Sequence, residues 1–281
     1  MVIRKSINID HNFLSYLEKN EAGATTIFFI HGNSGSARTW NSQLNSSLLS
    51  SYRLIAIDLP GHGDSFRSED PGKDYSPPAT AKLLATTITI LRQNKPFILV
   101  GFSYGTNLIA EMLQHEIRPD GICMIGMCCV GQLQPMNMVF KLESPPPVFF
   151  YNEKNKSVIT CSIENMLVEK DNTTFLADDY QDTDPFFRLC LMQAAANGNV
   201  SDEIELLQNF QIPICVVFGV NDTLINIDYL QDSILMMWEK KIFQIEAAGH
   251  FVHLDKQEEV NRLIQVYANE QFTRCRDSLH N

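Results

Sequence analysis

The stretch that decides the fold reads Phe97-Ile98-Leu99-Val100-Gly101-Phe102-Ser103-Tyr104-Gly105. An apolar run typical of a buried strand leads into Gly-x-Ser-x-Gly, and a helix-like run begins near Thr106. Between a strand and a helix, this pattern is a nucleophile elbow, a strained turn that lifts the serine hydroxyl out of the sheet. Its glycines let the strand and the helix approach closely. Because the pentapeptide alone also fits a glycine-rich turn with an exposed serine, Ser103 is predicted as a nucleophile only together with partners elsewhere in the chain.

Apolar runs elsewhere extend this unit into a sheet. Val2–Ile9 alternates in polarity like an edge strand, and 13–18 reads as its hairpin partner. Nearly continuous apolar runs, typical of parallel strands covered on both faces, occupy 25–30, 54–57, 97–100, 122–127, 214–218 and 241–245. Helices are predicted between or after them at 38–49, 78–92, 106–114 and 256–269. Strands that alternate with helices predict an α/β fold with right-handed crossovers.

One long segment interrupts this alternation. No clear strand is found from Gly131 to Gln211, and the triplet Pro145-Pro146-Pro147 excludes regular structure where it stands. Helical patterns follow at 163–168 and 185–196. We therefore expect a core made of 1–130 and 212–281, with 131–211 inserted as a helical cap over the active face.

Composition restricts the classes of function. The chain has 281 residues, of which 44% are hydrophobic and 20% charged, as in a globular enzyme of one large domain. Its net charge of −11 disfavours a nucleic-acid partner. No apolar stretch has the length of a membrane span, and the first ten residues do not resemble a signal peptide. The seven cysteines include no Cys-x-x-Cys pair, which predicts free thiols, no metal cluster and a cytoplasmic location.

A serine nucleophile needs a general base, and the base needs an orienting carboxylate. In this architecture the chain order is Ser, acid, His. Asp222 follows the strand at 214–218, although Asn221-Asp222 is also ordinary turn chemistry. His250 follows the last strand and is favoured as the base, because the small residues before it let a loop place its ring beside the serine. His253 is the alternative base, or else a lid contact or an exposed helix-entry residue.

An oxyanion hole needs two backbone N–H groups. Tyr104 supplies the N–H that follows the nucleophile, and Asn33, in the loop after the strand at 25–30, is expected to supply the other. The Asn33 side chain is a candidate substrate contact. His31 is expected to pack this loop, and His62 and Asp64 are expected to bond loop backbone rather than to take part in catalysis.

Together these segments resemble the α/β-hydrolase superfamily. The matching motifs span nearly the whole chain: 31–33, 58–65, 101–105, Asp222 and 249–250. The resemblance implies an eight-stranded, mostly parallel sheet with helices on both faces, a helical cap, and a Ser-His-Asp triad without metal or cofactor. Residues 31–36, 58–65, 75–76, 225–230 and Trp238 are similar to a bacterial subgroup that includes acyl-homoserine lactonases; the cap diverges from it.

The expected function is therefore hydrolysis of an ester or lactone of a small, partly apolar molecule through Ser103, Asp222 and His250. Phe102 and Tyr151 are expected to contact the substrate together with Asn33. The apolar acyl pocket is expected to come from cap residues Met136, Met138, Phe140, Val148, Phe149 and Tyr151. Acyl transfer by the same acyl-enzyme and a ligand sensor with little turnover remain alternatives. The oligomeric state is expected to be a monomer or a homodimer.

Overall fold

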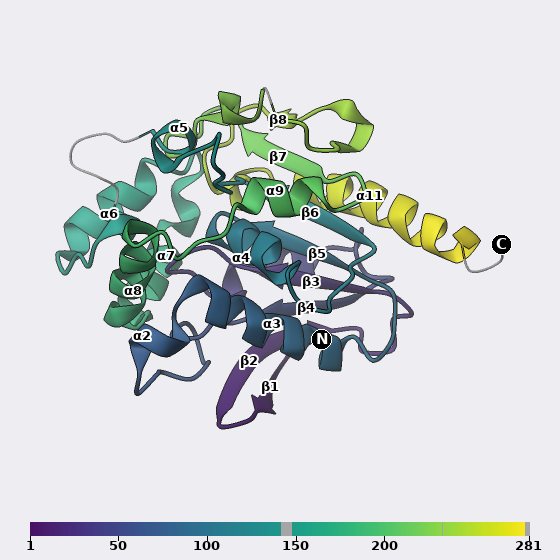
Figure 1. The fold of residues 1–281 in the computed structure, drawn as a ribbon, viewed down its shortest axis with the longest axis horizontal. Coiled ribbons are helices and arrows are strands. Elements are labelled where there is room, and N and C mark those ends of the chain that lie inside the picture. The colour runs from purple at the N-terminus through teal and green to yellow at the C-terminus, as the bar shows by residue number, and fades with distance from the viewer. Residues whose placement is uncertain (142–147, 232, 279–281) are drawn as a thin grey trace.

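The computed structural model describes residues 1–141, 148–231 and 233–278 and contains a twisted sheet with helices on both faces (Figure 1). Its eight strands follow the order β1-β2-β4-β3-β5-β6-β7-β8. Their bounds are β1 Ile3–Ile9, β2 Asn12–Lys19, β3 Thr26–Ile30, β4 Arg53–Ile57, β5 Phe97–Phe102, β6 Gly121–Ile125, β7 Cys215–Gly219 and β8 Phe243–Ile245. The predicted α/β fold, with its mostly parallel eight-stranded sheet, is confirmed.

Strand pairing follows the polarity of each segment. The amphipathic β1 lies at the edge and pairs antiparallel with β2, with Ile3 opposite Glu18, and β2 pairs antiparallel with β4. All other neighbours are parallel. Strands β3, β4, β5, β6 and β7 are buried along their full length, as the continuous apolar runs indicated. The parallel register brings the carboxyl ends of these strands to one end of the sheet.

Helices cover the sheet on both sides. One face carries α3 (Pro77–Leu91), α4 (Tyr104–Met112) and α9 (Glu203–Gln208), and the other carries α11 (Gln257–Ser278) (Figure 1). Shorter helices are α1 Asn41–Leu44, α2 Pro71–Asp74 and α10 Val252–Asp255. In the three described ranges, no helix combines the length and apolar character that crossing a bilayer requires.

The helix expected over 38–49 is wrong in extent. A 3₁₀ turn at Ala37–Trp40 and the single turn α1 replace it. The segment is rich in Asn and Ser, whose side chains bond nearby backbone: Asn45 Nδ2 donates to the Asn41 carbonyl at 2.9 Å, and Ser50 Oγ donates to the Ser47 carbonyl at 2.7 Å. Such local bonds compete with helix propagation. The spacing of apolar residues does not show that such side-chain bonds will shorten the helix.

Between β6 and β7 lies a segment that we call the β6–β7 insertion, residues 126–214. It forms no strand in its described residues and contains α5 Met136–Val139, α6 Lys156–Glu164, α7 Thr173–Asp182, α8 Pro185–Ala196 and α9. Figure 1 shows α6, α7 and α8 grouped beyond one end of the sheet. Helix α8 matches the predicted bounds, whereas α6 lies earlier than the helical pattern at 163–168. The proline triplet at 145–147 falls outside the described residues.

The turn from β5 into α4 has the strained backbone that the elbow motif predicts. Ser103 adopts φ 49° and ψ −123°, which L-residues rarely occupy. Helix α4 also crosses the end of β3 closely: a Cβ atom built on Gly105 would lie 2.3 Å from the Ile30 carbonyl oxygen. Only glycine fits this position, because the obstacle is backbone that no rotamer change can move.

We therefore predict that Gly105→Ala lowers the free energy of unfolding by more than about 3 kcal/mol, the upper range of overpacking costs. Gly72→Ala is the matched control. A Cβ there approaches other atoms no closer than 4.0 Å, so stability should change by less than about 1 kcal/mol. Urea unfolding followed by circular dichroism measures both, and equal stability of the two variants would contradict the close-approach argument.

Candidate active site

Three side chains from separate loops lie at the carboxyl end of the sheet. Ser103 follows β5, Asp222 follows β7 and His250 follows β8. Parallel strands carry their carboxyl ends to one edge, so residues distant in sequence become neighbours there. Ser103 and His250 line the same cavity.

Asp222 and His250 form a buried hydrogen-bonded pair. His250 Nδ1 lies 2.8 Å from Asp222 Oδ2, and the other carboxylate oxygen accepts from the backbone N–H groups of Leu224 at 2.8 Å and Ile225 at 2.9 Å. Burial by itself would raise the pKa of Asp222. The charge and hydrogen bond of His250, together with the two backbone donors, outweigh burial and lower this pKa. Asp222 is therefore held as an acceptor that fixes the orientation of the imidazole.

The second imidazole nitrogen remains available. His250 Nε2 is buried and has no hydrogen-bond partner among the described residues. The ring is held from the side by Phe102, with ring centroids 5.0 Å apart. A neutral imidazole that donates from Nδ1 presents Nε2 as a proton acceptor. The arrangement can therefore accept a proton at Nε2 within the cavity that Ser103 also lines.

His253, the alternative base, is placed elsewhere. It is fully buried in α10, with its ring 4.6 Å from that of Trp40 and 4.5 Å from that of Phe102, and burial lowers its pKa to about 3. Neither ring nitrogen has a hydrogen-bond partner among the described residues. The expectation of a lid contact or an exposed helix-entry residue is wrong, because the ring is fully buried against the aromatic rings of Trp40 and Phe102.

The two expected donors of the oxyanion hole border the same cavity. Asn33 lies in the loop after β3, and Tyr104 is the first residue of α4, where backbone N–H groups lack intrahelical acceptors. The Asn33 side chain forms hydrogen bonds within the protein: Nδ2 donates to the Phe149 carbonyl at 2.9 Å, and Oδ1 accepts from Ser34 Oγ at 2.8 Å. The bond to Phe149 ties the loop after β3 to the β6–β7 insertion.

Two buried histidines, His31 and His62, accept hydrogen bonds from backbone N–H groups in and beside this loop. His62 Nε2 accepts from the Ser34 N–H at 3.2 Å, and His31 Nε2 accepts from the Leu59 N–H at 3.0 Å. Burial lowers the pKa of both imidazoles. Their loop-packing role agrees with expectation, but Asp64 differs. Its carboxylate pairs with Arg4 at 3.0 Å instead of bonding loop backbone.

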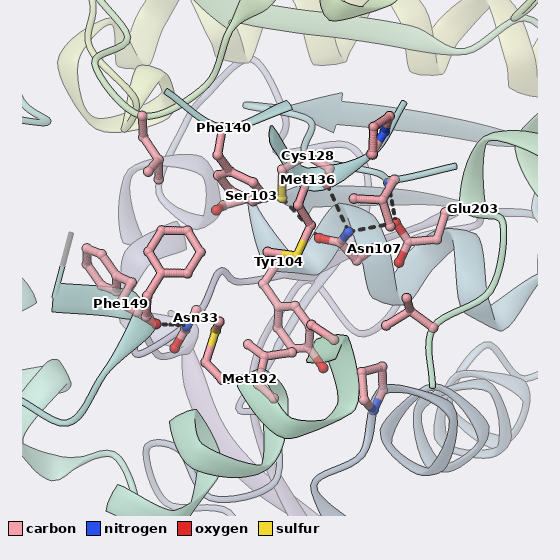
Figure 2. Close-up of a pocket in the computed structure, with 18 of the residues that line it drawn as sticks. Asn33, Ser103, Tyr104, Asn107, Cys128, Met136, Phe140, Phe149, Met192 and Glu203 are labelled. Carbon is pink, nitrogen blue, oxygen red and sulfur yellow. Dashed lines mark hydrogen bonds between the residues drawn. The ribbon is translucent and has the colours of Figure 1, made fainter. Parts of the chain in front are cut away.

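A cavity of about 440 Å³ adjoins Ser103 (Figure 2). Met136, Phe140 and Phe149, three of the residues expected in an apolar acyl pocket, line it, and so does Phe102. Met138, Val148 and Tyr151 do not line the cavity; Tyr151 instead packs beside Tyr180, whose hydroxyl donates to the Tyr151 carbonyl at 2.9 Å.

Several cavity residues from the core and the insertion were not predicted from the sequence: Asn107, Cys128, Leu191, Met192 and Glu203. Asn107 lies one helical turn after Ser103, a spacing that could have identified it. Glu203 carries no sequence signal, because its position depends on how α9 packs against α4. In the part of the chain that the structure describes, no group of three or more His, Cys, Asp or Glu could hold a metal ion.

Sequence comparison identifies a matching family and individual relatives. The model of the Alpha/beta hydrolase family matches residues 27–263. Mouse "Protein ABHD8" is 24% identical over 275 residues, covering 94% of this chain, and the chain spans only 60% of that relative's length.

Solved structures show the same fold with esterase and lactonase neighbours. The N-acyl homoserine lactonase AidH, complexed with N-hexanoyl homoserine lactone, superposes with a TM-score of 0.87 at 22% identity, covering 96% of this chain and 98% of AidH. A putative aryl esterase from Burkholderia cenocepacia superposes with a TM-score of 0.80 at 19% identity, covering 96% and 100%. The superfamily resemblance inferred from the motifs is thereby confirmed, and the chain belongs to the α/β hydrolase family.

Proposed function

We propose that the protein is a serine hydrolase that cleaves a carboxylic ester or lactone. The observation that carries this proposal is the buried hydrogen bond of 2.8 Å between His250 Nδ1 and Asp222, with Nε2 left free in the cavity that Ser103 lines. The lactonase and esterase among the structural neighbours support an ester or lactone as the substrate class.

In the proposed reaction, Ser103 Oγ attacks the carbonyl carbon while His250 Nε2 takes its proton. The negative oxygen of the tetrahedral intermediate accepts hydrogen bonds from the N–H groups of Asn33 and Tyr104, each of which contributes roughly 3–4 kcal/mol to the lowering of the barrier. The imidazolium then protonates the leaving alkoxide, and an acyl-enzyme remains on Ser103. Water, deprotonated by His250, releases the acid and restores Ser103.

We further propose that residues 131–211 act as a cap on a core formed by 1–130 and 212–281. Helix α8 of this segment brings Leu191 and Met192 to the cavity, and the chain before it brings Met136 and Phe149. This lining suits a small-molecule substrate with an apolar portion. The cap is tied to the loop of the oxyanion hole, since Arg188 Nη1 donates to Ser34 Oγ at 2.7 Å.

Replacing the nucleophile tests the reaction type. Ser103→Ala should reduce kcat for p-nitrophenyl butyrate and for N-hexanoyl homoserine lactone by about 10⁴-fold or more, because no other group forms the acyl-enzyme. A thermal melt of the variant checks that the fold survives. Activity within tenfold of wild type on every hydrolysed substrate would exclude Ser103 as the nucleophile.

Replacing the acid tests how the imidazole is oriented. Asp222→Asn should lower kcat by about 10⁴-fold, because an amide can hold the ring in the wrong tautomer. Asp228→Asn is the matched control. Asp228 is exposed and bonds Gln231, so its replacement should leave kcat within twofold. Similar kinetics for the two variants would refute the assigned role of Asp222.

A further inference from the structure

One carboxyl group in the cavity has no role in the proposed reaction. Glu203, the first residue of α9, is only 1% exposed and lines the same cavity as Ser103. No cationic side chain forms an ion pair with it among the described residues. Burying a carboxylate that has no cationic partner costs free energy unless the group is protonated or hydrogen-bonded. The presence of Glu203 in a ligand-sized cavity therefore needs a physical explanation.

Hydrogen bonds fix one oxygen of this carboxyl group and leave the other unused. Oε2 accepts from Asn107 Nδ2 at 2.7 Å and from the Val130 N–H at 2.8 Å. Asn107 is itself held, because its Nδ2 also donates to the Cys128 carbonyl at 3.0 Å and its Oδ1 accepts from Cys128 Sγ at 3.0 Å. Oε1 of Glu203 has no hydrogen-bond partner in the described residues. Figure 2 shows this network beside Ser103 and Tyr104.

The surroundings favour the neutral form of this carboxyl group. Burial, helped by the nearby carboxyl groups of Glu111 and Asp202, outweighs the Val130 and Asn107 hydrogen bonds and raises the pKa of Glu203 to about 8. Other titratable groups that interact with Glu203 electrostatically are all neutral when protonated: Tyr104, Cys128, Cys129 and Tyr229. Since Oε2 accepts two hydrogen bonds, the proton belongs on Oε1, which then becomes a donor.

We propose that Glu203 is a substrate-binding residue whose Oε1–H donates a hydrogen bond to a neutral oxygen acceptor carried by the substrate away from the scissile carbonyl. The inference rests on the proposed hydrolase function and narrows its substrate class. The substrate is an ester or lactone with a second carbonyl group, such as a ketone or an amide. A purely alkyl chain that displaced water from this donor would leave it unpaired, which disfavours binding of such a chain.

The position of Glu203 sets the spacing between the two groups. Asn107 lies one turn of α4 beyond Ser103, and Glu203 lies one hydrogen bond beyond Asn107. A helical turn plus a hydrogen bond spans on the order of 8 Å. That length corresponds to roughly six bonds of an extended chain. The cavity of about 440 Å³ accommodates a substrate of this size.

The test compares matched substrates that differ only in the second carbonyl. One series is p-nitrophenyl octanoate and its 5-, 6- and 7-oxo derivatives, and the other is octyl acetate and the acetates of the corresponding oxo-octanols. The readout is the ratio of kcat/KM for the best oxo substrate to that of its plain partner. Glu203→Leu should lower this ratio at least tenfold, whereas Glu203→Gln, whose amide also donates, should keep it within threefold. Glu205→Gln, on the exposed side of α9, is the matched control and should leave the ratio unchanged.

A pH profile gives a second readout that a purely structural role would not move. In the wild type the ratio should fall as the pH rises through about 8, because Oε1 loses its proton there. An effect of pH on the chemical step that the two substrates share cancels in the ratio. In Glu203→Gln the ratio should not change with pH. This comparison also decides the matter if Glu203→Leu does not fold.

The outcomes separate the two proposals. If Ser103→Ala abolishes hydrolysis while the ratio in both series is insensitive to Glu203→Leu, or to pH in the wild type, then the assignment of Glu203 is overturned and the hydrolase function stands. If Ser103→Ala leaves hydrolysis unchanged, the proposed function itself fails.

Discussion

The turn at Ser103 joins β5 to α4, and it brings α4 so close to β3 that only glycine, which has no side chain, fits at position 105. The Ser103 backbone is held at a positive φ, and Gly105 lies against the carbonyl of Ile30, so α4 starts directly over the end of β3. The strain is local, whereas the buried strands around it are held by packing along their whole length. This constraint places Ser103, Tyr104 and the loop that holds Asn33 at the same cavity.

The pair formed by Asp222 and His250 depends on this same frame. A buried carboxylate is unfavourable unless its oxygens are paired. Here the imidazole and two backbone N–H groups pair all of them, and the pKa of Asp222 is lowered in spite of burial. Glu203, which lines the cavity that His250 also lines, is the contrasting case. Its bonds come from neutral donors, burial prevails, and its pKa is raised to about 8. The pKa values of the two carboxyl groups thus shift in opposite directions, because Asp222 bonds the imidazole of His250 and Glu203 bonds only neutral donors.

The β6–β7 insertion is fastened to the core at the loop that follows β3. Asn33 bonds the Phe149 carbonyl, Arg188 bonds Ser34, and both Arg38 and Ser36 bond the buried carboxylate of Asp179 in α7. These contacts link the wall of the cavity to the expected donors of the oxyanion hole. A change in the position of the insertion would therefore act directly on the loop that holds Asn33.

Local patterns in the sequence determined the strands, the elbow and the chain order of Ser103, Asp222 and His250, because each depends on short-range periodicity or on turn chemistry. Periodicity failed over 38–49, where Asn and Ser side chains bond nearby backbone instead of allowing a helix. Only the tertiary structure decided that His253 is packed between aromatic rings, that Tyr151 does not line the cavity, and that Glu203 does. These placements depend on how the insertion and the last helices pack against the core, and packing between distant segments leaves no pattern in a single sequence.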